Sequence, residues 1–134
     1  MSDVLILKKR KDFVRVAAKG VKVATSTLIL QAALSLSVPK DTCRTGYTTT
    51  KKIGKAHIRN RTRRRMRAAV REIFPNRALS GVDYVLIGRY NTAECSFDKL
   101  KEDLCYGLKK LHKQLYPEEK KHELSSEKTA NLAD

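Results

Sequence analysis

Residues 51–71 read KKIGKAHIRNRTRRRMRAAVR, and this stretch dominates the chemistry of the chain. Ten of its 21 residues are Lys or Arg, and none is Asp or Glu. Burying an unpaired guanidinium group costs several kcal/mol, so these side chains must face outward. A segment this basic requires a polyanion nearby, and nucleic acid is the first candidate.

The spacing of apolar residues predicts an amphipathic helix over residues 58–74. One side of that helix carries Ile58, Thr62, Met66, Ala69, Val70 and Ile73. The opposite side gathers Asn60, Arg63, Arg64, Arg67 and Arg71, with Arg59, Arg61 and Arg65 nearer the edges. A solvated face held by salt bridges would need acids three or four residues away, and none precedes Glu72. Guanidinium groups pair with phosphate oxygens in a planar fork, so this pattern favours a nucleic-acid surface.

Composition sets the broad class of the protein. The chain has 134 residues, 29 Lys and Arg against 14 Asp and Glu, and a formal net charge of +15. Its length suits one domain with one core. The longest apolar stretch, residues 28–38, is shorter than the roughly 20 residues that span a bilayer, and the N-terminus lacks a signal-peptide pattern. We therefore expect a cytoplasmic protein with a nucleic-acid partner, and neither a membrane nor a small molecule as its ligand.

The residues that usually carry catalysis form no recognisable site. Cysteines and histidines are few and fall in no metal-ligand spacing: Cys43, Cys95, Cys105, His57, His112 and His122. Nucleophile-elbow, P-loop and HExxH patterns are absent. A metal-dependent protein nuclease is disfavoured because Asp12, Asp83 and Asp98 are too scattered to indicate a carboxylate cluster. The sequence predicts no catalytic residue and no metal site on the protein.

The rest of the chain predicts a mixed α/β body. We expect a helix over residues 9–19 that ends at Gly20, a single alternating strand over 21–38, and a turn at 39–41. A second strand is expected over 44–53, and Gly54 then allows a sharp turn into the basic helix. Residues 82–89 are apolar enough for a central strand.

The C-terminal part divides into a helix and a tail. Residues 96–116 predict a helix that begins with Ser96 as its N-cap and carries a leucine stripe toward the core; a partner-helix seam is the alternative. Residues 117–134 contain three lysines, five acids and no hydrophobic period. We expect this tail to be mostly disordered, which leaves residues 1–116 as the RNA-binding domain.

Residues 44–67 resemble the signature of the bacterial ribonuclease P protein subunit, R-x-G-x-x-x-S-K-K-x-G-x-A-V-x-R-N-R-x-K-R-x-x-R. The agreement is ungapped and includes Arg44, Gly46, Lys51, Lys52, Gly54, Ala56, Arg59, Asn60, Arg61, Arg64 and Arg67, with Arg63 in place of Lys. The flanks also match, in the K-x-x-D-F of residues 9–13 and in Gly88-Arg89 at the end of a strand. The resemblance covers about residues 9–115.

The resemblance implies a protein cofactor of a ribozyme that removes the 5′ leader from precursor tRNA. It makes the protein a subunit of an endoribonuclease whose RNA carries the Mg²⁺-dependent hydrolysis and binds most of the Mg²⁺. The residues implied to bind the catalytic RNA are Lys51, Lys52, Lys55, Arg59, Asn60, Arg61, Arg63, Arg64 and Arg67. A cleft between the first helix and the sheet is implied to take the single-stranded leader through Phe13, Gln31, Thr48 and Thr50.

The fold implied by the resemblance is α+β, ordered α-β-β-β-α-β-α, with a central mixed sheet and a left-handed βαβ crossover that opposes the usual handedness. The chain departs from the family pattern at four positions. Ala17 and Gln31 stand where aromatic residues are frequent, Thr50 replaces Ser, and His57 replaces Val. The first two departures predict weaker stacking of leader bases.

One alternative function remains open from composition. A non-enzymatic structural RNA-binding protein, such as a ribosomal or RNA-chaperone component, would be equally basic. Mixed α/β topology suits RNA better than a DNA-reading helical trio. Only the ungapped signature separates the ribozyme cofactor from the structural protein.

Overall fold

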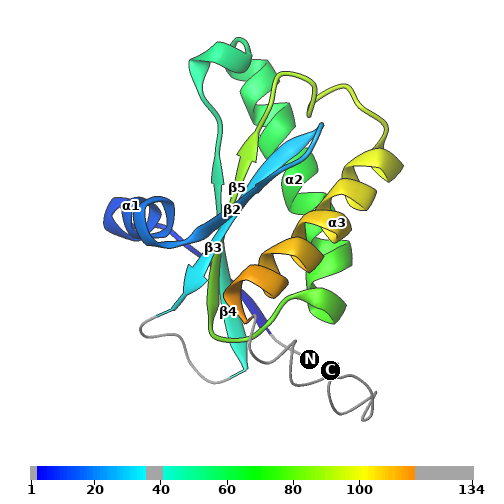
Figure 1. Cartoon of the computed structure of the whole chain (residues 1–134). Helices are drawn as coiled ribbons and strands as arrows, with labels where there is room; N and C mark the ends of the chain where they lie inside the picture. Colours follow the sequence, from blue (N-terminus) through cyan, green and yellow to red (C-terminus); the bar gives the residue numbers. More distant parts are fainter. Residues whose placement is uncertain (1–2, 36–40, 117–134) are drawn as a thin grey trace.

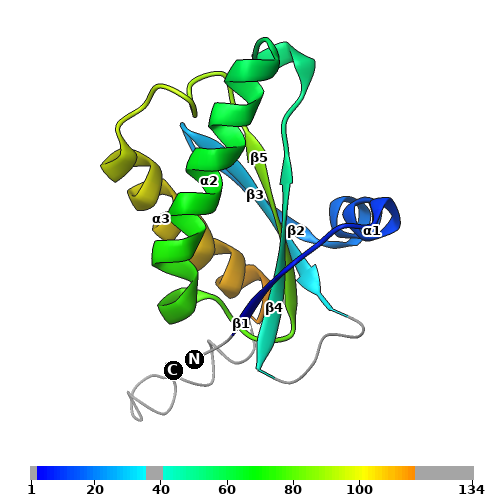
Figure 2. The same cartoon turned by 180° about the vertical axis from the view of Figure 1, so that it is seen from behind.

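The computed structural model describes residues 3–35 and 41–116, and the expected tail lies outside this part of the chain. In chain order its elements are β1 (Asp3–Ile6), α1 (Arg10–Lys19), β2 (Val21–Ala24), β3 (Leu28–Leu34), β4 (Thr42–Thr48), the 3₁₀ helix η1 (Lys51–Ile53), α2 (Ala56–Arg77), β5 (Val82–Gly88) and α3 (Phe97–Leu115). The strands form one mixed sheet in the order β1-β4-β5-β3-β2. Helix α1 covers one face, and α2 and α3 cover the other (Figures 1 and 2). The predicted α+β class is confirmed.

The N-terminal strand β1 was not predicted. It has four residues and pairs in parallel with β4, with Asp3 opposite Thr42. Leu5 and Ile6 are 38% and 54% exposed, so this edge strand has no strict alternation between a buried and a solvated face. A strand this short is defined by its long-range partner rather than by its own pattern.

The prediction of a single strand over residues 21–38 is wrong. β2 and β3 form an antiparallel hairpin in which Val21 lies opposite Ala32, with a turn at residues 25–27. Within the turn, Thr25 Oγ1 donates to the Leu28 carbonyl at 2.7 Å. The carboxylate of Asp103 on α3 accepts hydrogen bonds from Ser26 Oγ, Thr27 N and Thr27 Oγ1 at 3.1, 3.2 and 2.7 Å. The turn is fixed by a distant residue instead of a local glycine or proline. Residues 36–40, with most of the predicted turn at 39–41, lie outside the described part.

The second strand was predicted over residues 44–53, but it ends earlier and is followed by a helical turn. β4 ends at Thr48, and residues 51–53 form η1. There, Ile53 N donates to the Thr50 carbonyl and Gly54 N donates to the Lys51 carbonyl, both at 3.2 Å. Gly54 has a φ of 144°, which favours glycine, and so turns the chain into α2 as predicted.

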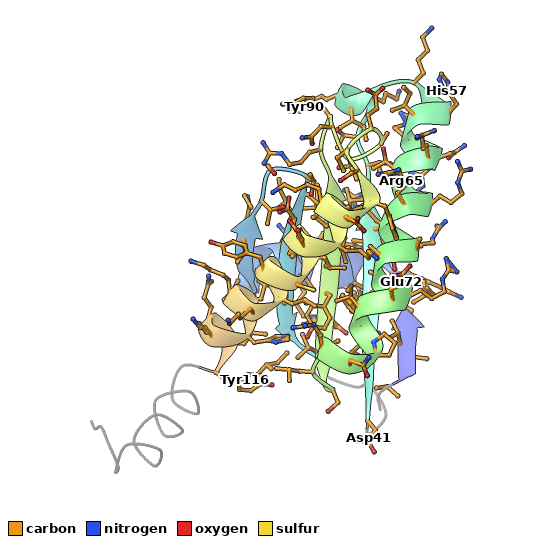
Figure 3. All side chains as sticks on the ribbon, turned by 90° about the vertical axis from the view of Figure 1, so that its right-hand side faces the viewer. Asp41, His57, Arg65, Glu72, Tyr90 and Tyr116 are labelled. Atoms are coloured by element: carbon orange, nitrogen blue, oxygen red, sulfur yellow. The ribbon has the colours of Figure 1, made fainter. Side chains whose placement is uncertain are left out.

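The connection between β4 and β5 has the unusual handedness. The two strands are adjacent and parallel, and α2 joins them. In Figure 3 both run upward behind α2, and β5 lies to the left of β4. With the helix in front, a step to the left is a left-handed crossover, against the common rule.

Two apolar clusters hold the layers together. The larger lies between the sheet and helices α2 and α3 and includes Leu30, Met66, Phe74 and Tyr84. The leucine stripe of α3 belongs to it, since Leu100, Leu104, Leu108 and Leu111 are at most 1% exposed, which confirms the core interpretation. The smaller cluster lies under α1 and consists of Leu7, Val16, Ala33 and Val85, with Phe13 and Ile87 packed against it. No helix in the described ranges has the length and hydrophobicity needed to cross a membrane.

Replacing Asp103 with Ala is expected to lower the free energy of unfolding by about 1–3 kcal/mol at pH 7, because three donors of the β2–β3 turn lose their acceptor. Burial opposes ionisation, but hydrogen bonds from Thr27, Lys99 and Ser26 outweigh it and lower the pKa of Asp103. A lowered pKa adds stability that is present above the unfolded value of about 3.9 and is lost as the pH falls through the folded value. Urea unfolding at several pH values should therefore show that the difference in the free energy of unfolding between the variant and wild type becomes smaller below about pH 4.

The matched control is Asp98→Ala on the same helix, because the Asp98 side chain is 92% exposed. It should change stability far less at every pH. Equal losses for the two variants would contradict the role given to Asp103.

Candidate nucleic-acid interface

Helix α2 begins without the usual neutralising groups. Its N-cap, Lys55, makes no side-chain capping bond, and its first turn contains no acid. The free backbone N–H groups at a helix N-terminus and its positive dipole end favour an anion. The helix is anchored to the core by Thr62, Met66, Ala69, Val70 and Phe74. The predicted buried stripe is thus largely confirmed, with Ile58 and Ile73 half-buried.

The opposite side of α2 is exposed and cationic. We call it the arginine face, and it consists of the exposed residues Asn60, Arg64, Arg67 and Arg71. Lys51, Lys52 and Lys55, just before the helix, are exposed as well. Within the described residues, no arginine of α2 has an acidic partner within 4 Å. The one acid of the helix, Glu72, pairs instead with Lys101 of α3 at 3.0 Å.

Other α2 arginines have structural partners. Arg61 Nε donates to the Ala93 carbonyl at 2.7 Å, and Arg65 Nε donates to the Thr92 carbonyl at 3.0 Å. Arg65 also donates to the carbonyl of Cys95. These bonds fasten the loop of residues 89–95, which follows β5, to the side of α2. Arg61 is nonetheless exposed.

Arg63 and Arg67 connect α2 to β4 and to the chain just beyond it. Arg63 donates to Thr49 Oγ1 and, at 2.6 Å, to Asn60 Oδ1. The guanidinium carbon of Arg67 lies 5.5 Å from the centroid of the Tyr47 ring, a cation–π distance. Burial raises the pKa of Tyr47, although the nearby Arg67 and Arg71 oppose the shift, so this phenol is neutral beside the arginine face. Arg59, which also belongs to the predicted set, is half-buried.

The predicted leader residues lie mostly on the other face of the sheet, beneath α1. Gln31 of β3 lies opposite Val85, and Thr48 of β4 lies opposite Ile87, so the two share the α1 side of the sheet. Phe13 is half-buried and packs over Gly46, where an added Cβ atom would lie 2.5 Å from its ring and would require the ring to move. Thr50 is exposed beyond the end of β4, at the start of η1. The structure brings Phe13, Gln31 and Thr48 together and places Thr50 at the edge, nearer the lysines.

A buried ion-pair cluster on the α1 side was not predicted. The Asp83 carboxylate is 0% exposed and accepts hydrogen bonds from Arg44 Nε at 2.8 Å and from Arg44 Nη2 at 2.7 Å. Arg15 of α1 also donates to Asp83, and Asp12 lies within 3.7 Å of Arg44. The hydrogen bond to Asp83 raises the pKa of Arg44. Arg44, the first residue of the signature, therefore holds the sheet and α1 together.

An open basic pocket of about 540 Å³ adjoins this cluster. It is lined by Ile6, Lys8, Lys9, Lys11, Asp12, Arg15 and Arg44. Its lysines, Lys8, Lys9 and Lys11, lie before the signature in the sequence, outside the basic stretch of residues 51–71. They extend the positive charge of the molecule to the side of the sheet that carries the predicted leader residues.

The described residues include no group of three or more His, Cys, Asp or Glu side chains arranged to hold a metal ion. Asp12 and Asp83 do converge, but on two guanidinium groups. Burial, with a smaller contribution from Asp83, raises the pKa of the Cys43 thiol to about 11, which makes it a poor nucleophile. His112 is bonded to Tyr84 Oη at 2.8 Å, and burial lowers its pKa. The arrangement is suited to binding a polyanion.

Comparison of the sequence with known proteins points to one family. The family profile described as ribonuclease P matches residues 1–112. The ribonuclease P protein component of Paramagnetospirillum magneticum is 48% identical over 107 residues, covering 78% of this chain and 80% of the relative. That of Gluconacetobacter diazotrophicus is 48% identical over 104 residues, covering 78% of this chain and 88% of the relative.

Solved structures give the same result. The ribonuclease P protein of Staphylococcus aureus superposes with a TM-score of 0.66 at 26% identity, covering 78% of this chain and 92% of that one. The protein from Thermotoga maritima gives 0.64 at 25% identity, with 78% and 93% covered. None of these relatives favours the structural RNA-binding alternative. With its fold, its signature and these relatives in agreement, the chain belongs to the ribonuclease P protein family.

Proposed function

We propose that this protein binds the catalytic RNA of ribonuclease P through the arginine face of α2 and the lysines that lead into it. The observation that carries the proposal is the lack of any acidic partner for the α2 arginines in the described structure. Phosphate contacts of this kind supply nearly all of the non-specific affinity of a basic protein for nucleic acid and a large share of its specific affinity. Lys51, Lys52, Lys55, Arg59 and Arg61 extend the same surface. Arg63 donates to Asn60 of the arginine face and to Thr49 just beyond β4, so it connects the two.

The leader of precursor tRNA is proposed to lie on the α1 side of the sheet. Gln31 and Thr48 offer neutral hydrogen-bonding groups on that side, and the Phe13 ring packs over Gly46. Polar contacts of this type suit an unpaired strand whose sequence varies. Thr50 lies between this side of the sheet and the lysines, which would place the leader next to the catalytic RNA.

Hydrolysis is proposed to be carried by the RNA, with Mg²⁺ bound mainly there and the protein acting in the cytoplasm. The carboxylates that converge in the described structure, Asp12 and Asp83, are paired with Arg15 and Arg44, and they do not fit a metal ion. The protein would neutralise phosphate charge as the two RNAs approach. It would thereby lower the Mg²⁺ concentration that the reaction needs.

Reconstitution of cleavage tests this function directly. The purified protein alone should leave precursor tRNA intact, and adding it to the RNA subunit at low Mg²⁺ should start removal of the leader. Cleavage is measured by gel separation of end-labelled precursor. The absence of any stimulation at low Mg²⁺ would contradict the proposal.

The arginine face predicts a change in salt dependence. Replacing both Arg64 and Arg67 with Ala should reduce the slope of log affinity against log salt by up to about two phosphate equivalents, because each lost contact releases one counterion fewer. Binding of the RNA subunit is measured at several KCl concentrations.

Arg65→Ala is the matched control on the same helix. Its guanidinium is bonded to loop carbonyls, so its loss should cost about 1–3 kcal/mol of stability and leave the salt slope unchanged. An unaltered slope in the double variant, or an equal change in the control, would remove the arginine face from the interface.

The proposed leader side predicts selective loss of affinity for precursor. Gln31→Ala and Thr48→Ala should each weaken binding of precursor tRNA to the assembled enzyme by about twofold to tenfold, the effect of one neutral hydrogen bond. Binding of a tRNA without a leader serves as the control and should not change. Equal weakening for both RNAs would place these residues outside the leader contact.

A further inference from the structure

Tyr90 is an exposed aromatic residue that neither the signature nor the α1 side includes. It follows β5 and is 74% exposed, the highest value among the large apolar side chains in the described ranges. Single exposed apolar side chains are common on protein surfaces, so exposure alone assigns nothing. Tyr90 is distinguished by the hydrogen bonds that hold its loop and by the charge of the surface around it.

The loop that presents Tyr90 is held by hydrogen bonds from α2, to the β2–β3 turn and within the loop itself. Arg61 donates to Ala93, and Arg65 donates to Thr92 and Cys95, as described above. The hydroxyl of the fully buried Thr92 donates to the Thr27 carbonyl and accepts from Arg89 N, the latter at 2.8 Å. The ring therefore projects from a fixed backbone, which reduces the entropy lost when a ligand packs against it.

Tyr90 also lies at the cationic end of the molecule. Gly88, two residues earlier, contacts this end closely: a Cβ atom there would lie 2.5 Å from Thr62 Cγ2 of α2 and 3.7 Å from Ile53 Cδ1 of η1. The end of β5 is thus packed against the segment that carries Lys51 and Lys52. Figure 3 shows Tyr90 at the same end of the molecule as His57, in the first turn of α2. The loop has one acid, Glu94, among these basic residues.

We propose that Tyr90 stacks on an unpaired nucleobase of the RNA that the arginine face binds, an inference that rests on the proposed function. An uncovered aromatic ring on a fixed loop at the cationic end of a protein suits single-stranded RNA, because every base offers a π-face and every linkage a phosphate. The contact is apolar, whereas the contacts of the arginine face are ionic. The two kinds of contact therefore respond differently to salt.

Tyr90→Ala, measured with the full chain, tests the stacking contact. Affinity should fall by about fivefold to a hundredfold, the usual effect of removing one base–aromatic stack, and the salt slope should stay unchanged. Tyr90→Phe keeps the ring and should bind within about twofold of wild type. Tyr106→Ala is the matched control, because Tyr106 is 53% exposed on α3 and its ring is covered by Lys110 at 5.4 Å. It should bind like wild type.

Two arms identify the source of the base. In the first, the RNA subunit alone is titrated with each variant; in the second, the enzyme assembled with saturating protein is titrated with precursor tRNA. A loss in the first arm assigns the base to the catalytic RNA, and a loss confined to the second assigns it to the precursor. Unchanged affinity of Tyr90→Ala in both arms, an equal loss for Tyr106→Ala, or a flatter salt slope would overturn the stacking proposal. If wild-type protein failed to stimulate cleavage, the proposed function would fail and this inference with it, whereas normal stimulation with an unaffected Tyr90→Ala overturns the stacking alone.

Discussion

The buried carboxylate of Asp83 is the interaction on which the arrangement of the molecule depends. It lies on the central strand β5, and it is 0% exposed. Two guanidinium groups neutralise it, one from β4 and one from α1, so it joins three elements at one point. Removing one partner of a buried ion pair typically costs about 3–5 kcal/mol, because the remaining charge is left in a poorly solvated site. With the apolar cluster beneath α1, these ion pairs hold α1 in its position over the sheet.

The structure divides the arginines of one helix between two tasks. Arg61 and Arg65 donate to loop carbonyls, whereas Arg64, Arg67 and Arg71 keep their charge at the surface. The division follows from helical geometry, because residues 61 and 65 lie one turn apart on the side that meets the loop of residues 89–95. Residue type alone does not separate a binding arginine from a structural one. The two kinds are distinguished by whether the backbone carbonyls of the loop of residues 89–95 accept hydrogen bonds from them.

Hydrophobic periodicity in the sequence predicted the elements that have a clear apolar stripe or run of their own: α1, α2, α3 and the central strand β5. It failed where a distant residue decides the local structure. Asp103 fixes the turn that splits residues 21–34 into a hairpin, and pairing with β4 makes a strand of residues 3–6. The exposed arginines were found because charge without nearby acids is visible in sequence. The loop of residues 89–95 and the Asp83 cluster were missed, because both join side chains far apart in the chain.

The corner between β4 and η1 has a consequence for how two RNAs would share this protein. Thr48, on the proposed leader side, and Lys52, at the start of the basic surface, are separated by four peptide steps, which span at most about 14 Å. The bond from Arg63 to Thr49 braces this short segment against α2. Under the proposed function the corner is a fixed spacer: it sets the separation between the leader and the catalytic RNA at the length of a few nucleotides. The protein would then hold the leader at a fixed distance from the catalytic RNA near the cleavage position.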